Sequence, residues 1–247
     1  MTRRRWIADK WDDETATLTG SQAAHLARVL RAERGMKADV VAGGRLFHST
    51  VDEVRQDDNG EMEVRFALLD EASAESALPI TLVMAVYKFD RMEWAIEKAT
   101  ELGVAAIAPV IARRSEKHLA QSAAKRAERW RRIAREAAQQ SRRSDVPEIH
   151  DPVVLKERMQ LEMNAVRIVL AEQERATMLH ETVQGAIQDH ESTPAFEIAV
   201  GPEGGWAPEE AKMFEANGWK AVSLGSRILR AETAAIAALA VTASLLE

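Results

Sequence analysis

The chain has 247 residues, of which 46% are hydrophobic and 29% charged, a balance typical of a globular protein with material for one large or two modest domains. It contains no cysteine, which excludes disulfides, thiol catalysis and cysteine-ligated metals and is consistent with a reducing cytosol. The formal net charge of −6 is unusual for a nucleic-acid-binding protein, but an average conceals how charge is distributed.

Residues 1–72 are predicted to form a small β-barrel with one helix. The stretch 38–70 holds three β-rich runs separated by Gly-Gly and by Asp-Asp-Asn-Gly, which are hairpin signals. The stretch SQAAHLARVLRAE is predicted to be a helix with Ser21 as its N-cap and Leu26, Val29 and Leu30 on one face. The basic N-terminal residues lead into no apolar run, so we expect no secretory signal.

Residues 73–79 are acidic and end in a proline, and we expect them to be a linker. From Ile80 onward apolar strands alternate with helical patterns, which predicts a parallel sheet covered on both faces. The strands are expected at 80–87, 104–112, 165–172, 196–200 and 220–225.

Four helices are expected in this second part. The first extends from Asp90, its N-cap, to Gly103, its C-cap, and the second from about Ser122 to Arg142. The third begins near Pro208, and the last covers 231–246 and is apolar on nearly every side. Because a bilayer takes roughly 20 apolar residues to span, we read the last helix as buried and expect no membrane role.

Basic residues are concentrated between Ile111 and Arg143. Eleven Lys or Arg stand there against three Glu, so this segment carries +8 and the rest of the chain −14. A basic stripe on an acidic protein is typical of a polyanion-binding surface. The solvated face of a long helix has the same composition, so the charge alone leaves both interpretations open.

The stretch GPEGG, residues 201–205, lies between a predicted strand and a predicted helix. It matches neither the dinucleotide fingerprint GxGxxG nor the P-loop, and the carboxylates of Glu203, Glu209 and Glu210 would face a bound phosphate. A ligand with a cationic centre and an adenosine moiety suits this turn better, and S-adenosylmethionine has both. A tight turn made of structural glycines is the alternative.

A second turn of this kind, LGSRILRAETA at 224–234, also joins a predicted strand to a predicted helix. Two such turns at the carboxyl ends of strands define one crevice, where open α/β sheets bind their ligands.

Together these motifs resemble the RsmE family of 16S ribosomal RNA uridine-N3 methyltransferases, within the SPOUT superfamily. The stretches HLARVLR, DRMEWAIEKATELGV, RRSEK and RWRRIAREAAQQSRR agree as well, so the resemblance covers nearly the whole chain in order. Two positions depart from the family pattern. Phe89 stands where the family usually has glycine, and the family tends to read Gln-Ser-Gly-Arg where this chain has Gln140-Ser141-Arg142-Arg143; both concern loop shape.

The resemblance implies an α/β fold with a PUA-like β-barrel at 1–72 and a SPOUT methyltransferase domain at 80–247. In that domain the C-terminal segment forms a deep trefoil knot, and the last helix is buried in the knot and against a second subunit of a homodimer. Knots are nearly absent from proteins, so no periodicity in the chain predicts one.

The resemblance also implies the site residues. Those expected to bind S-adenosylmethionine are Glu172, Gly201, Pro202, Glu203, Gly204, Gly205, Leu224, Gly225, Ile228, Leu229, Arg230 and Thr233. Those expected to bind RNA are Arg3, Arg4, Arg5, His25, Arg28, Arg31, Arg113, Arg114, Lys117, Arg129, Arg132, Arg135, Arg142 and Arg143. The six histidines show no metal-ligand spacing and there is no cysteine, so we expect no metal.

We therefore predict a cytoplasmic homodimer that transfers methyl from S-adenosylmethionine to a uridine N3 in small-subunit ribosomal RNA, as free RNA or in the small ribosomal subunit. A SPOUT enzyme acting on tRNA or another rRNA base, and a non-catalytic RNA-binding assembly factor, stay open. Arg230 is the expected stabiliser of the uracil anion, and Glu232, Glu203 or water takes the proton. Alternatively, Arg230 pairs with one of these carboxylates and braces the knot.

Overall fold

The computed structural model describes residues 5–57, 59–161 and 164–247. These form two compact units. The first comprises the described residues up to Ser76 together with Ala138–Val146, and the second comprises Ala77–Ala137 and Pro147–Glu247.

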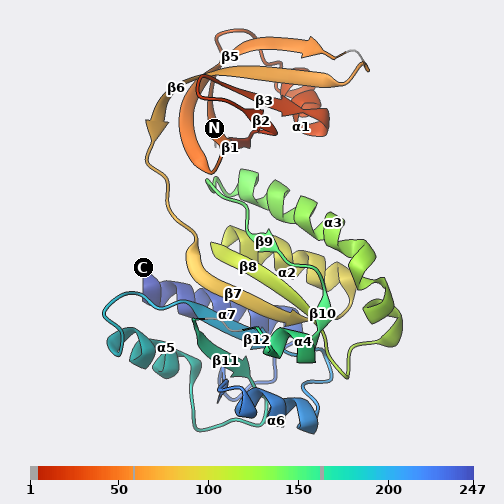
Figure 1. The fold of residues 1–247 in the computed structure, drawn as a ribbon, viewed down its shortest axis with the longest axis vertical. Helices are drawn as coiled ribbons and strands as arrows, with labels where there is room; N and C mark the ends of the chain where they lie inside the picture. The colour runs from red at the N-terminus through yellow and green to blue at the C-terminus, as the bar shows by residue number, and fades with distance from the viewer. Residues whose placement is uncertain (1–4, 58, 162–163) are drawn as a thin grey trace. The chain divides into compact units, whose positions relative to one another are not determined.

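The first unit is built on a six-stranded sheet in the order β1-β4-β5-β6-β3-β2 (Figure 1). Its strands are β1 (Arg5–Ile7), β2 (Lys10–Trp11), β3 (Thr15–Thr19), β4 (Lys37–Ala42), β5 (Arg45–Gln56) and β6 (Met62–Ala72). Strands β1 and β4 pair in parallel and the other neighbours pair antiparallel. Gly43 and Gly44 both have positive φ, which the tight β4–β5 hairpin requires. The three predicted β-rich runs are therefore confirmed.

The helix of this unit differs from the prediction. It begins as α1 (Gly20–Ala24), capped by Thr19 rather than Ser21, and continues as the π-helical η1 (His25–Val29). The wide turn is closed by the Leu30 N–H, which donates to the carbonyl of His25 at 3.2 Å. Because a π-turn rotates later side chains off the α-helical face, Leu26 is buried while Val29 is 64% exposed.

The second unit contains a seven-stranded sheet in which all neighbouring strands pair in parallel (Figure 1). A parallel sheet was predicted, but with five strands. Its order is β10-β8-β7-β12-β11-β13, with β9 pairing β8. The strands are β7 (Leu78–Ala85), β8 (Val104–Ile111), β9 (Glu148–Ile149), β10 (Val153–Val154), β11 (Val166–Leu170), β12 (Phe196–Val200) and β13 (Lys220–Val222).

Six helices cover the two faces of this sheet: α2 (Phe89–Glu101), α3 (Lys117–Gln140), α4 (Leu155–Met159), α5 (Leu179–Gln188), α6 (Pro208–Ala216) and α7 (Ala231–Leu246). Alternate β7 residues enter different cores. Leu82 and Met84 lie in the core with residues of α2, α3, α5 and α7, whereas Val83 and Ala85 lie in the core with residues of α4 and α6. Both faces are thus buried, which explains why the strands are continuously apolar.

Helix boundaries depart from the sequence expectation at several points. Helix α2 begins one residue earlier than Asp90, and Lys88 is its N-cap without a side-chain cap bond. Helix α3 begins at Lys117, five residues before the expected start. Helix α7 covers the expected residues. Among the described residues no helix is long and apolar enough to cross a membrane.

Candidate cofactor-binding and catalytic site

The two glycine turns lie at one edge of the parallel sheet. Strand β11 pairs with β12 on one side and β13 on the other, all in parallel, so their carboxyl ends face the same way. The segments after these strands, 171–178, 201–207 and 223–230, therefore emerge together (Figure 1). This is the edge at which open α/β sheets bind ligands.

The first loop is shaped by its glycines and by Trp206. The Gly205 N–H donates to the Pro202 carbonyl at 2.8 Å, and Gly205 has a φ of +68° that favours glycine. A Cβ on Gly201 would lie 3.3 Å from the Trp206 ring, so the missing side chain lets the indole pack against the backbone. A Cβ on Gly205 would meet no atom within 4 Å.

Side chains from elsewhere fasten this loop. Arg114, which follows β8, donates to the carbonyls of Gly204 at 2.7 Å and Trp206 at 3.3 Å. Buried Glu210 accepts the backbone N–H groups of Ala207 at 2.8 Å and Arg113 at 2.7 Å. The loop is thereby tied to α6 and to the end of β8.

These contacts correct one expectation about charge. Glu210 caps α6 instead of facing a ligand, and Glu209 pairs with the Arg113 side chain at 3.1 Å. The third of these carboxylates, Glu203, shares an arginine with Glu232 of the second glycine turn, as described below.

The second loop leads from β13 into α7. Ser223 Oγ accepts the Gly225 N–H at 3.2 Å, and Gly225 has a φ of +118°. Ile228 is 76% exposed although it is apolar, and Leu229 beside it is half-buried. Arg230 is the exposed N-cap residue of α7 and makes no side-chain cap bond.

An arginine of α2 joins the two loops. The Arg91 guanidinium lies 3.7 Å from a carboxylate oxygen of Glu203 and 3.7 Å from one of Glu232. Within the described part of the chain Arg230 has no ion pair, so the bracing contact proposed for Arg230 is made by Arg91. Sequence reasoning missed Arg91, although it lies in the DRMEW stretch that carries the family resemblance.

The charges of the same two carboxylates act on Tyr87, which follows β7. It is 1% exposed, and burial together with the charges of Glu232 and Glu203 raises its pKa well above the ordinary value. Among the described residues its hydroxyl has no hydrogen-bond partner, and neither does the buried Oε2 of Glu232. Buried polar atoms without partners are rare in native structures and call for an explanation.

In the segment after β11, Glu174 rather than Glu172 makes the ordered contacts. Glu172 is exposed, whereas one oxygen of Glu174 accepts the N–H groups of residues 175–177, which lowers the pKa of Glu174. Sequence reasoning named Glu172 and missed Glu174. An acid followed by a turn can accept hydrogen bonds from the next backbone N–H groups, and this pattern would have indicated Glu174.

The predicted cofactor residues are thus gathered at one edge with different accessibility. Pro202 is buried, Gly201, Gly205, Leu224, Gly225 and Leu229 are half-buried, and Gly204, Ile228, Arg230, Thr233 and Glu172 are exposed.

The basic helix α3 is partly neutralised within the protein. Arg129 donates to both carboxylate oxygens of Glu93 at 2.7 and 2.8 Å, which leaves it less able to bind phosphate. Lys117 and Arg132 are exposed, and neither forms an ion pair within the described residues. Arg135 contacts other residues and is half-buried.

The remaining predicted RNA-binding residues lie in the first unit. Arg28 and Arg31 are exposed, and the His25 ring lies 6.3 Å from the Trp6 ring. Arg5 donates to the Arg142 carbonyl, and Arg143 pairs with Asp145. Arg3 and Arg4 lie outside the described residues.

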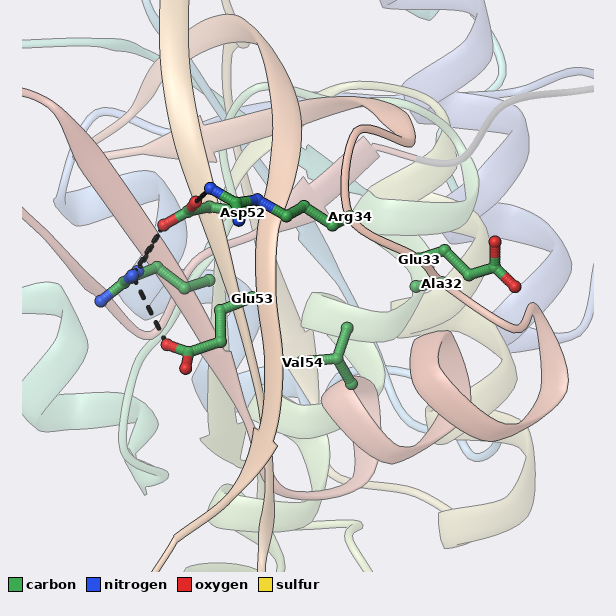
Figure 2. A pocket seen from close by; sticks show the side chains of 7 residues that line it. Ala32, Glu33, Arg34, Asp52, Glu53 and Val54 are labelled. Carbon is green, nitrogen blue, oxygen red and sulfur yellow. Dashed lines mark hydrogen bonds and ion pairs between the residues drawn. The ribbon is translucent and has the colours of Figure 1, made fainter.

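Figure 2 shows side chains that line an open hollow in the first unit. The hollow has a volume of about 490 Å³. Arg65 pairs with Asp52 at 2.7 Å and Glu53 at 3.4 Å, and Arg34 approaches Asp52 at 3.5 Å. Because its basic groups are engaged with its own acids, this hollow suits a polyanion poorly. The lining residues are Ala32, Glu33, Arg34, Asp52, Glu53, Val54 and Arg65. In the described ranges, no group of His, Asp and Glu is arranged to hold a metal.

Comparison with known proteins identifies the class. A family model described as the RNA methyltransferase domain matches residues 74–243, which include both glycine loops and the whole parallel sheet. Together with the loop-bearing edge of that sheet, this match defines an α/β RNA methyltransferase domain.

Two relatives narrow the class. The chain is 34% identical to the ribosomal RNA small subunit methyltransferase E of Synechocystis over 95% of this chain and 75% of the relative. It is 32% identical to that of Bacillus subtilis over 91% of this chain and 88% of the relative. The chain belongs to the ribosomal RNA small subunit methyltransferase E family.

Solved structures agree with this assignment. The methyltransferase E of Neisseria gonorrhoeae, bound to S-adenosyl methionine, superimposes with a TM-score of 0.81 at 28% identity, covering 98% of each chain. A Legionella pneumophila methyltransferase in complex with SAM gives a TM-score of 0.81 at 30% identity, covering 99% of this chain and 98% of that one.

Proposed function

We propose that this protein methylates N3 of a uridine in 16S ribosomal RNA, with S-adenosylmethionine as methyl donor. The observation that carries the proposal is the convergence of the 201–207 and 223–230 loops at one sheet edge, with Arg91 between the carboxylates of Glu203 and Glu232. Family membership and the cofactor in related structures support the choice of reaction.

The residues present fit such a cofactor. Added Cβ atoms on Gly205 and Gly225 would meet nothing within 4 Å, so both loops leave their backbone open to close approach. Exposed Ile228 offers an apolar surface for an adenine ring. Two carboxylates opposed by one arginine suit a cationic ligand better than a phosphate.

The bound donor supplies a methyl group on a sulfonium. Uracil N3 carries a proton at neutral pH and lies on the Watson–Crick edge, so the base must be unpaired and turned into the site. The N3–H proton passes to Glu203, Glu232 or water. The N3 electron pair forms the new N–C bond as the electrons of the C–S bond return to sulfur, so one proton is released per methyl transferred.

In this proposal Arg230 stabilises the uracil anion. It is exposed at the start of α7, directly after Ile228 and Leu229, and it forms no ion pair within the described residues. A guanidinium aimed at a developing oxyanion on the uracil ring lowers the free energy of deprotonation.

The finer architecture belongs to the same proposal. We infer that the curled sheet at 1–72 is a PUA-like barrel, that 73–79 is the linker, and that 80–247 is a SPOUT domain whose C-terminal segment is knotted. The exposed cations Lys117 and Arg132 of α3 and Arg28 and Arg31 of the first unit support an RNA-binding role. Because ribosomal RNA is the proposed substrate, the protein works in the cytoplasm.

We further propose a homodimer. Helix α7 buries Ala235, Ala238 and Leu239, but its opposite face is also apolar and includes exposed Ala240 and half-exposed Ile236. An apolar helix face of this length is more than a monomer's surface usually exposes. Light scattering should give twice the chain mass at micromolar concentration, and a stable monomer would contradict the proposal.

Mass spectrometry of nucleosides tests the reaction. Unmodified 16S RNA, free or in small subunits, is incubated with the protein with and without S-adenosylmethionine, then digested. A cofactor-dependent N3-methyluridine is expected. A different methylated base, or methylation of tRNA only, would assign another SPOUT activity. RNA binding without any methyl incorporation would assign an assembly factor.

A further inference from the structure

Arg91 lies where three separate elements meet. It comes from the first turn of α2, Glu203 from the loop after β12 and Glu232 from the first turn of α7. Both nearest N–O distances are 3.7 Å, which is ion-pair contact and longer than a hydrogen bond. Arg91 therefore holds two carboxylates electrostatically without using up their hydrogen-bonding oxygens.

The two carboxylates differ in their access to water. The side chain of Glu203 is 32% exposed and that of Glu232 is 12% exposed. Solvent can satisfy the oxygens of Glu203, whereas Oε2 of Glu232 is buried and, within the described residues, has no partner. A buried charged oxygen without a donor is costly, so we expect it to accept a hydrogen bond from a ligand.

Tyr87 belongs to a fourth segment, the one that follows β7. Both carboxylates act on it, and with burial they keep its hydroxyl protonated and neutral. The site therefore offers one guanidinium and two carboxylates, and of these two Glu232 has a desolvated oxygen without a partner within the described residues.

We propose that Arg91 is a positioning residue for Glu232, and that Glu232, not Glu203, receives the N3 proton of the target base. This rests on the proposed function. Arg91 is anchored by Glu203 and holds the Glu232 carboxylate with its free oxygen facing the base. The proton moves from N3 to that oxygen as the N–C bond forms, and the resulting carboxylic acid then releases it to water.

Removing Arg91 leaves the negative charges of Glu203 and Glu232 without the guanidinium that lies 3.7 Å from each. Their repulsion turns the Glu232 carboxylate away from its position, while the backbone of both glycine loops stays in place. The loss therefore falls on kcat and not on the binding of S-adenosylmethionine. A displacement of about 1 Å in a catalytic group costs about 10²-fold in rate.

The test compares Arg91→Met, Arg91→Lys and a matched control, Lys98→Met. Lys98 lies two turns along the same helix, its side chain is 31% exposed against 30% for Arg91, and it too pairs with two carboxylates. For each, the binding constant for S-adenosylmethionine, the melting temperature, and kcat and KM on 16S RNA are measured. We expect Arg91→Met to lose about 10²-fold in kcat with cofactor affinity within threefold. Arg91→Lys should recover at least tenfold of that loss, and Lys98→Met should behave as wild type.

A second pair of variants separates the carboxylates and does not depend on Arg91→Met folding. Glu232→Gln should lose at least tenfold more kcat than Glu203→Gln. Equal losses, or a larger loss for Glu203→Gln, would overturn the assignment of the proton acceptor. Wild-type kcat in Arg91→Met, or a loss that appears only in cofactor affinity, would overturn the positioning role. If the wild-type protein forms no N3-methyluridine in the same assay, the proposed function fails instead.

Discussion

Replacing Gly204 by alanine tests whether the first glycine loop touches the cofactor. Without cofactor, the protein should tolerate a side chain at Gly204, because the φ of this residue lies outside the left-handed region. The added Cβ would lie 3.5 Å from Cδ of Arg114, an ordinary contact. The unliganded variant should therefore be as stable as wild type or gain about 0.4–1 kcal/mol.

The expected loss follows from mass action. At 100 times its dissociation constant, S-adenosylmethionine stabilises the wild type by about 2.7 kcal/mol. A methyl group forced into a filled site costs about 1–3 kcal/mol, which weakens binding by about 5- to 160-fold. At the same cofactor concentration the stabilisation then falls to about 0.3–1.8 kcal/mol.

Thermal unfolding with and without S-adenosylmethionine measures this difference. For a chain of this size 1 kcal/mol corresponds to about 2–4 °C, so the wild-type shift should be about 5–11 °C and the Gly204→Ala shift clearly smaller. Gly185→Ala in α5 is the matched control, because its Cβ would meet no neighbour within 4 Å and its φ, like that of Gly204, lies outside the left-handed region. A full shift in Gly204→Ala would refute the placement of the cofactor against this loop.

Three further outcomes are expected. Arg230→Ala should bind S-adenosylmethionine normally and lose about 10²-fold in turnover, while Arg227→Ala on the same loop stays active; equal activity of both would remove Arg230 from the mechanism. Tyr87 is the single tyrosine of the chain, and its pKa is raised in the folded protein. Above about pH 10 the phenol ionises in the unfolded chain only, so the free energy of unfolding should be constant with respect to this group below that pH and fall as the pH rises further. Tyrosinate absorbance in an alkaline titration should therefore appear together with unfolding and not before it. Lys117→Glu with Arg132→Glu should weaken RNA binding and lower the log–log salt slope by about 0.7–0.9 per lost phosphate contact; unchanged binding would mean a solvated helix face.

Local features of the second unit were predictable from the sequence. Apolar strands alternating with helical patterns predicted the parallel sheet, and the predicted bounds of α7 agree with Ala231–Leu246. The two glycine turns were recognisable because each is a contiguous stretch whose strand and helix neighbours lie beside it in the chain. Periodicity and turn chemistry depend on residues a few positions apart, so a single sequence carries them.

Side-chain partners that are distant in the chain were not predictable. Glu203, Glu209 and Glu210 look alike as sequence, yet Glu210 caps α6, Glu209 pairs with Arg113 and Glu203 faces Arg91. The sheet order decides this, because it places the loops after β12 and β13 on either side of β11 and brings the start of α2 beside them.

The same reason explains the other differences between sequence and structure. Arg129 seemed a free cation of a basic stripe until the packing of α3 on α2 placed Glu93 against it. Val29 followed an α-helical pattern, but a π-turn rotated it into solvent. Periodicity and turn chemistry thus predicted the parallel sheet and the glycine loops, and the resemblance of several motifs indicated the family. The tertiary structure decided which charges meet, because ion pairs form between neighbours in space and not in sequence.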